Sequence, residues 1–120
     1  RARVMAAAIE LVLDCADPER QAAFWAAALG YELVGAAAQY HMLAPPSGES
    51  GPALMLQQVP EPRRAKNRMH LDVLTDDVDR EVDRLVALGA RVVGEVIEEL
   101  GHRWRPMADP EENEFCVCSC

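Results

Sequence analysis

The stretch that decides the fold is residues 9–14, which read IELVLD, because a similar stretch, MHLDVL, occurs at residues 69–74. Each copy leads through an Asp and an apolar stretch to a glycine and a second apolar run. These runs are LGYELVG at residues 29–35 and LGARVVG at residues 88–94. Such self-similarity predicts two structural repeats that arose by duplication and share one core. We expect a functional site where the two repeats meet.

Turn and cap residues divide each repeat into one helix and four strands. In the first repeat Asp17 is a favourable N-cap, Pro18 suits the first helical turn, and Gly30 predicts the end of the helix. After the opening strands, further strands are predicted at residues 31–34, 39–43 and 54–59, and at residues 91–97, 102–107 and 114–118. The predicted fold class is α+β, with two tandem β-α-β-β-β modules that form curled mixed sheets around a shared cavity.

The length of 120 residues predicts a single domain over residues 1–120, because neither half is large enough to bury a stable core alone. Module one is expected at about residues 8–60 and module two at about residues 67–120, with a Pro- and Arg-containing linker between them.

The net charge of −8 argues against a nucleic-acid partner, since that kind of binding depends on clustered Lys and Arg. No apolar run reaches the roughly 18 residues that would suggest a membrane span, so we expect a cytoplasmic protein without a membrane partner. Cys116, Cys118 and Cys120 alternate along a predicted strand and would line up on one face. We therefore expect small apolar thiols rather than disulfides, with a thiolate metal site as the alternative.

Alternation along the strands separates a face under the helices from a face that lines the cavity. The rows expected under the helices are Ile9, Leu11, Leu13, Leu54, Leu56, Met69, Leu71, Val73, Phe115 and Val117. The cavity residues predicted on the other side are Glu10, Met55, Gln57, His70, Asp72, Trp104, Met107, Glu114 and Cys116. For two of these residues, alternatives stay open. The Trp104 indole either stacks on a planar ligand or makes ordinary packing contacts within the protein. Glu114 is either a cavity carboxylate or a solvated residue at the end of its strand.

Two segments carry a family resemblance, KNRMHLD at residues 66–72 and MADPEENEF at residues 107–115. With the doubled β-α-β-β-β pattern, they resemble the glyoxalase/bleomycin-resistance/dioxygenase superfamily, also called vicinal oxygen chelate proteins, and within it the bacterial glyoxalase-like branch. The resemblance covers nearly the whole chain. It implies, in metal-using members, a divalent cation held by a His or Glu on each opening strand and a Glu on each closing strand.

Carried onto this chain, the opening positions match Glu10 and His70, which stand at equal distances before the capping Asp of their helices. The closing positions match Gln57 and Cys116, so an amide and a thiol replace the two carboxylates. The resemblance thus implies Glu10, His70 and Cys116 as ligands of one zinc, iron, manganese or nickel ion. The alternative is a packed Cys116 and a hydrogen-bonded His70. Relatives carry Gly where this chain has Glu112, so we expect strain there if the turn needs a positive φ.

Three classes of function follow from the resemblance and the residues. We favour a metal-free small-molecule binding protein of the bleomycin-resistance type, because two of the four ligand positions lack carboxylates. The second class is a metal-dependent lyase, isomerase or dioxygenase acting on vicinal oxygens. The third is a metal-free hydrolase or dehydratase that uses Glu10, Asp72 or His70 as acid and base. Paired modules and apolar edge strands also predict a homodimer, whose interface would help to complete the cavity.

Overall fold

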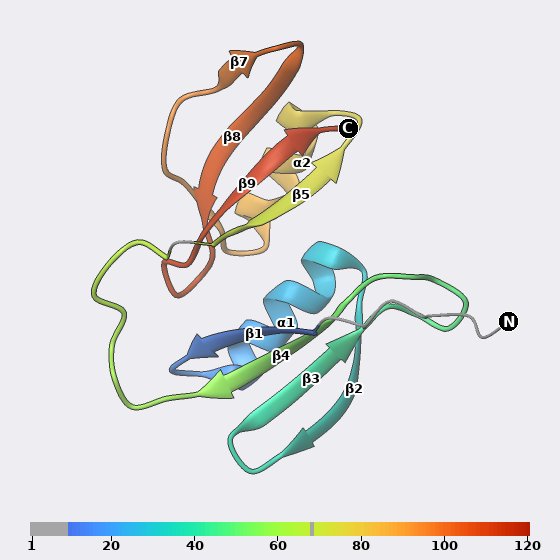
Figure 1. Ribbon diagram of the computed structural model, residues 1–120, viewed down its shortest axis with the longest axis vertical. Helices are drawn as coiled ribbons and strands as arrows, with labels where there is room; N and C mark the ends of the chain where they lie inside the picture. Colours follow the sequence, from blue (N-terminus) through green and yellow to red (C-terminus); the bar gives the residue numbers. More distant parts are fainter. Residues whose placement is uncertain (1–9, 68) are drawn as a thin grey trace, which may run out of the picture.

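The computed structural model describes residues 10–67 and 69–120, which form two successive modules (Figure 1). The first contains β1 (Glu10–Cys15), α1 (Pro18–Leu29), β2 (Glu32–Ala37), β3 (Tyr40–Ala44) and β4 (Ala53–Gln58). The second contains β5 (Leu71–Thr75), α2 (Val78–Ala87), β6 (Arg91–Val92), β7 (Ile97–Glu99), β8 (His102–Ala108) and β9 (Glu114–Ser119). The predicted α+β class with tandem β-α-β-β-β modules is confirmed.

Both helices begin at the predicted caps. The Asp17 side chain accepts a hydrogen bond from the backbone N–H of Arg20 at 3.2 Å, and Asp77 does the same for Arg80 at 3.1 Å. Gly30 ends α1 in the left-handed conformation with φ 69°, as its lack of a Cβ allows. Among the described residues, neither helix is long and apolar enough to cross a membrane.

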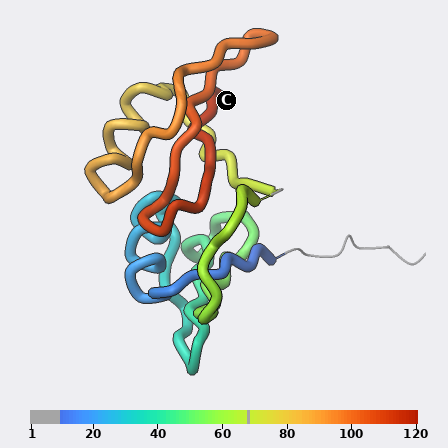
Figure 2. The backbone as a smooth tube through the Cα atoms, turned by 90° about the vertical axis from the view of Figure 1, so that its left-hand side faces the viewer, coloured from blue at the N-terminus to red at the C-terminus, as the bar shows by residue number. Residues whose placement is uncertain are grey.

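Each module forms its own sheet. The strand order is β1-β4-β3-β2 in the first and β5-β9-β8-β6 in the second, with β7 also paired to β8. The opening and closing strands run parallel in both sheets, while the remaining pairs are antiparallel. Both helices lie on one side of the molecule, and the linker runs along the opposite side (Figure 2). Each sheet therefore has a covered face and an open face.

The second module departs from the predicted strand at residues 91–97, which is broken into β6 and β7. Pro106 in β8 explains the break, because proline has no N–H to donate to an antiparallel neighbour. Pairing with β8 stops after Val92 and resumes at Ile97. Between them the chain bends at Gly94, where an added Cβ would lie 3.3 Å from Cγ of Pro106.

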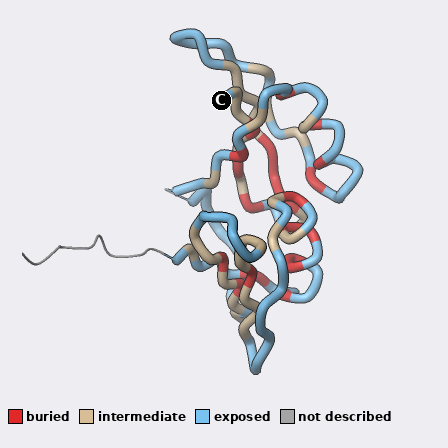
Figure 3. The backbone as a smooth tube through the Cα atoms, turned by 90° about the vertical axis from the view of Figure 1, so that its right-hand side faces the viewer, coloured by how far each residue is buried: buried red, intermediate tan, exposed pale blue. Residues whose placement is uncertain are grey.

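One apolar cluster fills the space between the sheets and the helices, and it includes residues of both modules (Figure 3). Leu54, Leu56, Phe115 and Val117 are at most 2% exposed, as alternation predicted. The prediction for Met69 was wrong, since its side chain is 77% exposed. Met69 precedes the first residue of β5 and therefore escapes the strand alternation. Ile9 lies outside the described residues.

The modules are joined by the loop between β8 and β9, which packs against α1. Asp109 is 1% exposed and accepts hydrogen bonds from Nε2 of Gln21 at 2.7 Å and from Nε1 of Trp25 at 3.1 Å. The Trp25 and Phe115 rings meet edge to face, with centroids 5.2 Å apart. Arg84 of α2 also donates to backbone carbonyls at the end of α1. These contacts hold the second module against α1 of the first.

Candidate functional site

A cavity of about 950 Å³ lies at the junction of the modules, in the part of the chain that the structure describes. Its walls come from β1, the linker, the start of β5, and the loop that leads into β9. Three of the predicted cavity residues, Glu10, His70 and Glu114, line it together. The opening strands of the two repeats therefore contribute to the same cavity.

Strand β1 supplies an exposed row of alternating side chains, Glu10, Val12 and Asp14. Val12 is 54% exposed, although it is a large apolar residue in the middle of a strand. β1 is an edge strand whose only partner among the described strands is β4. The wall thus combines an apolar contact surface with two carboxylates.

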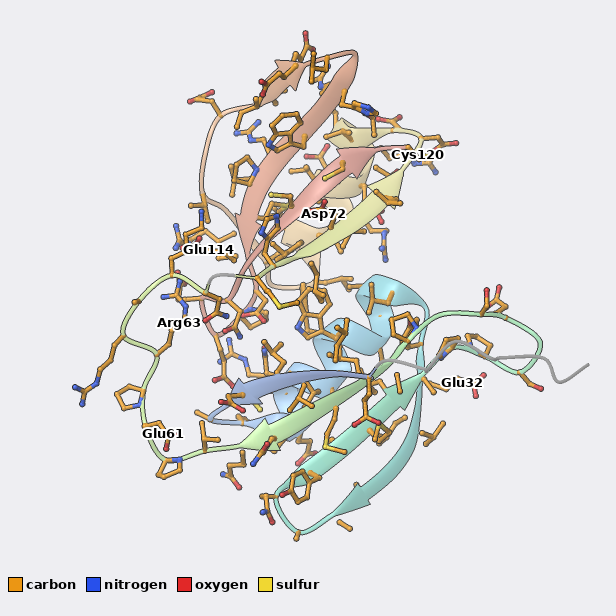
Figure 4. The ribbon with its side chains drawn as sticks, in the orientation of Figure 1. Glu32, Glu61, Arg63, Asp72, Glu114 and Cys120 are labelled. Atoms are coloured by element: carbon orange, nitrogen blue, oxygen red, sulfur yellow. The ribbon has the colours of Figure 1, made fainter. Side chains whose placement is uncertain are left out.

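Glu114 lines the cavity beneath the linker. Arg63 Nη2 lies 3.1 Å from one Glu114 oxygen, and Lys66 Nζ lies 3.7 Å from the other. Figure 4 shows Arg63 reaching from the linker toward Glu114. The sequence predicted a Pro- and Arg-containing linker but not this contact, because no spacing rule connects residues so far apart in the chain. The Glu114 carboxylate lines the junction cavity and is partly exposed to solvent.

The open face of the second sheet brings His70, Asp72 and Cys116 together. One ligand atom from each side chain lies within 4.8 Å of the other two, and His70 Nε2 is 3.2 Å from Asp72 Oδ1. Asp72 is the register partner of Cys116 in the parallel β5–β9 pair. The sequence analysis named all three as cavity residues, but it did not predict the contact between His70 and Asp72.

The thiols of this face are held in the neutral form. Burial and then the charge of Asp72 raise the pKa of Cys116, and the same two causes raise the pKa of Cys118 to about 12. Burial is also the main reason that the pKa of Cys15 rises to about 11. At neutral pH these cysteines are therefore small, weakly polar side chains, as predicted for unpaired thiols.

The other predicted cavity residues lie elsewhere. Met55, Gln57 and Trp104 are half-buried on the sheets, and none of them lines the junction cavity as described. The prediction for Met107 was wrong, because this side chain is 0% exposed and belongs to the core. Met107 is the register partner of Phe115, so both point under the helix. Met107 and Trp104 are separated by an odd number of positions, which places them on opposite faces of β8.

The observed strand register assigns a different residue to one of the four metal-ligand positions that the resemblance implies. Cys116 pairs with Asp72, and the equivalent residue of β1, Val12, pairs with Met55 rather than with Gln57. The four positions therefore carry Glu10, Met55, His70 and Cys116. In the described part of the chain, Glu10 does not join the cluster of close ligand atoms. A thioether, together with a Glu10 carboxylate that lies outside the cluster, does not fit the four-ligand site that the resemblance implies.

The turn before β9 follows the sequence expectation. Glu112 adopts φ 69°, a conformation that glycine accommodates and other residues adopt at a cost. Its carboxylate pairs with the guanidinium of Arg91. The turn itself is held by Asp109, which accepts hydrogen bonds from the backbone N–H groups of Glu111 and Asn113, both at 2.9 Å.

The fold and the junction cavity define a two-module α+β protein with one shared cavity. The chain belongs to the glyoxalase-like domain family, whose model matches residues 10–118. No curated protein sequence matches the chain.

Solved structures share the fold at low sequence identity. One is a glyoxalase/bleomycin resistance protein/dioxygenase family enzyme from Burkholderia phytofirmans PsJN, with 16% identity, a TM-score of 0.76 and coverage of 92% of this chain and 95% of that chain. Another is TioX from Micromonospora sp. ML1, with 22% identity, a TM-score of 0.64 and coverage of 95% and 98%. The hypothetical protein SA1046 from S. aureus has 18% identity, a TM-score of 0.71 and coverage of 98% and 96%.

Proposed function

We propose that this domain binds a small organic molecule in the junction cavity, without need of a metal ion. The observation that carries the proposal is the cavity itself. Its volume of about 950 Å³ lies within the range of roughly 300–1,000 Å³ typical of small-molecule sites. Its lining combines apolar side chains with many charged and polar groups, chiefly carboxylates, which suits a partly apolar ligand that also carries hydrogen-bond donors.

Val12 offers a direct test, because its exposed side chain lies on the cavity wall. Trp25 also lines the cavity, so its fluorescence reports occupancy. We expect a compound screen by thermal shift to yield ligands that bind the wild type. Their affinity, measured by fluorescence titration, should fall at least about tenfold in Val12→Arg, because the long charged side chain projects into the cavity from its wall. A chelator should leave the affinity unchanged.

Val34 provides the matched control. It is a strand valine with a similar exposure of 59%, and it lies outside the cavity. Val34→Arg should bind the same ligands as the wild type. Equal losses in the two variants, or a screen in which no compound stabilises the wild type, would contradict the proposal.

A second candidate function is metal-free acid–base catalysis. One observation favours it: the His70 imidazole lies at the cavity and 3.2 Å from the Asp72 carboxylate, which can orient a general base. The test is a panel of hydrolase and dehydratase substrates. Turnover that resists chelators and is lost in His70→Ala would favour catalysis over binding alone.

We also propose a homodimer. Large apolar side chains stay exposed on the open side of both sheets, including Val12 at 54% and Leu74 at 66%. Burial of such side chains favours association. Light scattering should give twice the mass of the chain, and a monomer at micromolar concentration would refute this assembly. The cytoplasmic location stays a prediction from the sequence.

A further inference from the structure

Strand β1 presents one edge of its backbone to the junction cavity. Within the part of the chain that the structure describes, its only strand partner is β4, and Figure 1 shows β1 as the strand of its sheet nearest to the second module. All residues of β1, Glu10–Cys15, line the cavity. Since neighbouring side chains of a strand point to opposite faces, a cavity that contacts all of them lies along the edge of the strand.

The parallel register with β4 determines which backbone groups lie on this edge. The backbone N–H of Val59 donates to the carbonyl of Cys15 at 2.9 Å, so the backbone of Cys15 faces β4. Backbone hydrogen-bonding groups alternate between the two edges of a strand, so those of Leu13 also face β4. Those of Val12 and Asp14 therefore point toward the cavity, and in the described residues they have no hydrogen-bond partner.

The charges on β1 decide which kind of strand fits this edge. Glu10 and Asp14 lie on either side of Val12 on the cavity wall, and neither carboxylate belongs to an ion pair within the described residues. If β1 of a second copy paired antiparallel about Val12, Glu10 would lie opposite Asp14, and like charges in that position destabilise a strand pair. A strand with basic side chains instead forms favourable pairs with both carboxylates.

We propose that the ligand of the junction cavity is an extended basic peptide that adds to the free edge of β1. Such addition is a common mode of peptide recognition, in which main-chain hydrogen bonds give affinity and side chains give specificity. Here the backbone of Val12 bonds the peptide backbone, while Glu10 and Asp14 bind its Lys or Arg side chains. The inference rests on the proposed function and names the ligand class of that same cavity.

The test is amide hydrogen exchange, followed by NMR on the full chain. The probe is a peptide of alternating lysine and valine with blocked ends, as long as β1. When the peptide binds, the amides of Val12 and Asp14 should exchange at least about tenfold more slowly, because each becomes a hydrogen-bond donor. The amide of Leu13 already donates to β4 and is the internal control. The same peptide with glutamate in place of lysine should protect neither edge amide.

Two variants of Val12 separate the backbone contact from the side-chain contact. Val12→Pro removes the N–H on the free edge, a place where strands tolerate proline. It should weaken binding of the lysine peptide at least about tenfold. Val12→Ala keeps the N–H and should weaken binding less. Circular dichroism establishes that both variants are folded.

Three results would overturn the proposal. The first is a Val12 amide that stays unprotected in excess peptide, and the second is equal binding by Val12→Pro and Val12→Ala. The third is protection without peptide that grows with protein concentration, which would assign the edge to a second copy. The compound screen tests ligand binding separately. If compounds lose affinity in Val12→Arg while no peptide protects the edge, the cavity binds other ligands and the peptide proposal alone fails.

Discussion

At the scale of single residues, Asp109 connects the two modules. It is buried in the loop before β9, and it accepts hydrogen bonds from two side chains of α1 as well as from its own turn. An uncompensated carboxylate would be costly at this depth, but donors from Gln21, Trp25 and Asn113 surround it. We therefore propose that the chain unfolds as one domain rather than as two modules.

Asp109→Ala tests this role. Each buried donor left without an acceptor costs about 1–3 kcal/mol, so the free energy of unfolding should fall by at least about 2 kcal/mol. Urea unfolding, followed by fluorescence and by circular dichroism, should show one transition shifted to lower urea. Asp83→Asn on the exposed side of α2 is the control and should change little. Two separate transitions in the wild type would contradict the single domain.

Cys118 makes a pH-dependent contribution to stability. An ordinary cysteine has a pKa of 9.0, and the fold raises the pKa of Cys118 to about 12, chiefly by burial. The folded state thus holds this proton more tightly than the unfolded state. Its contribution is fully present below pH 9 and is lost as the pH rises toward about 12. In reducing buffer, the free energy of unfolding of the wild type should fall faster over this pH interval than that of Cys118→Ser. If the two free energies fell in parallel with pH, Cys118 would not be the source of the pH dependence.

At the scale of elements, the hairpin between β7 and β8 carries a conformational cost. Leu100 has φ 53° and is 91% exposed, and Gly101 beside it has φ 77°. Two successive positive φ values define a type I′ turn, which favours Asn-Gly over Leu-Gly. No core contact compensates a leucine with so exposed a side chain.

Leu100→Asn should therefore stabilise the protein by about 0.5–1 kcal/mol, because asparagine adopts the left-handed conformation more readily. Thermal unfolding would show a higher Tm. Leu33→Asn is the comparison, since Leu33 is also exposed, at 53%, but lies in an extended strand. A lower Tm for Leu100→Asn would mean that the leucine side chain makes a stabilising contact, for instance with a second copy.

The elements were largely predictable from local chemistry. Asp17, Pro18 and Gly30 act within one or two turns of the chain, so the limits of α1 follow from the sequence. The division of the strand after α2 was missed, because it depends on Pro106 in the neighbouring strand. Met107 was assigned to the wrong face for a related reason: its orientation is set by register with Phe115.

At the scale of the whole molecule, the duplication predicted where the site lies better than which residues form it. Glu10 and His70 could be predicted, because equivalent positions of two repeats meet at a shared junction. The contact of Arg63 with Glu114 could not be predicted, since it depends on the path of the linker across the cavity. The replacement of Gln57 by Met55 as the counterpart of Cys116 required the observed register of β1 with β4.

The central claim is that both modules contribute to one ligand-binding cavity. The most direct measurement is a nitrogen-15 NMR titration of the full chain with a ligand from the screen. We predict that resonances of Val12 in β1, of His70, and of Glu114 at the start of β9 shift together with the same dissociation constant. Shifts confined to one module, or centred on a surface away from these three residues, would contradict the account.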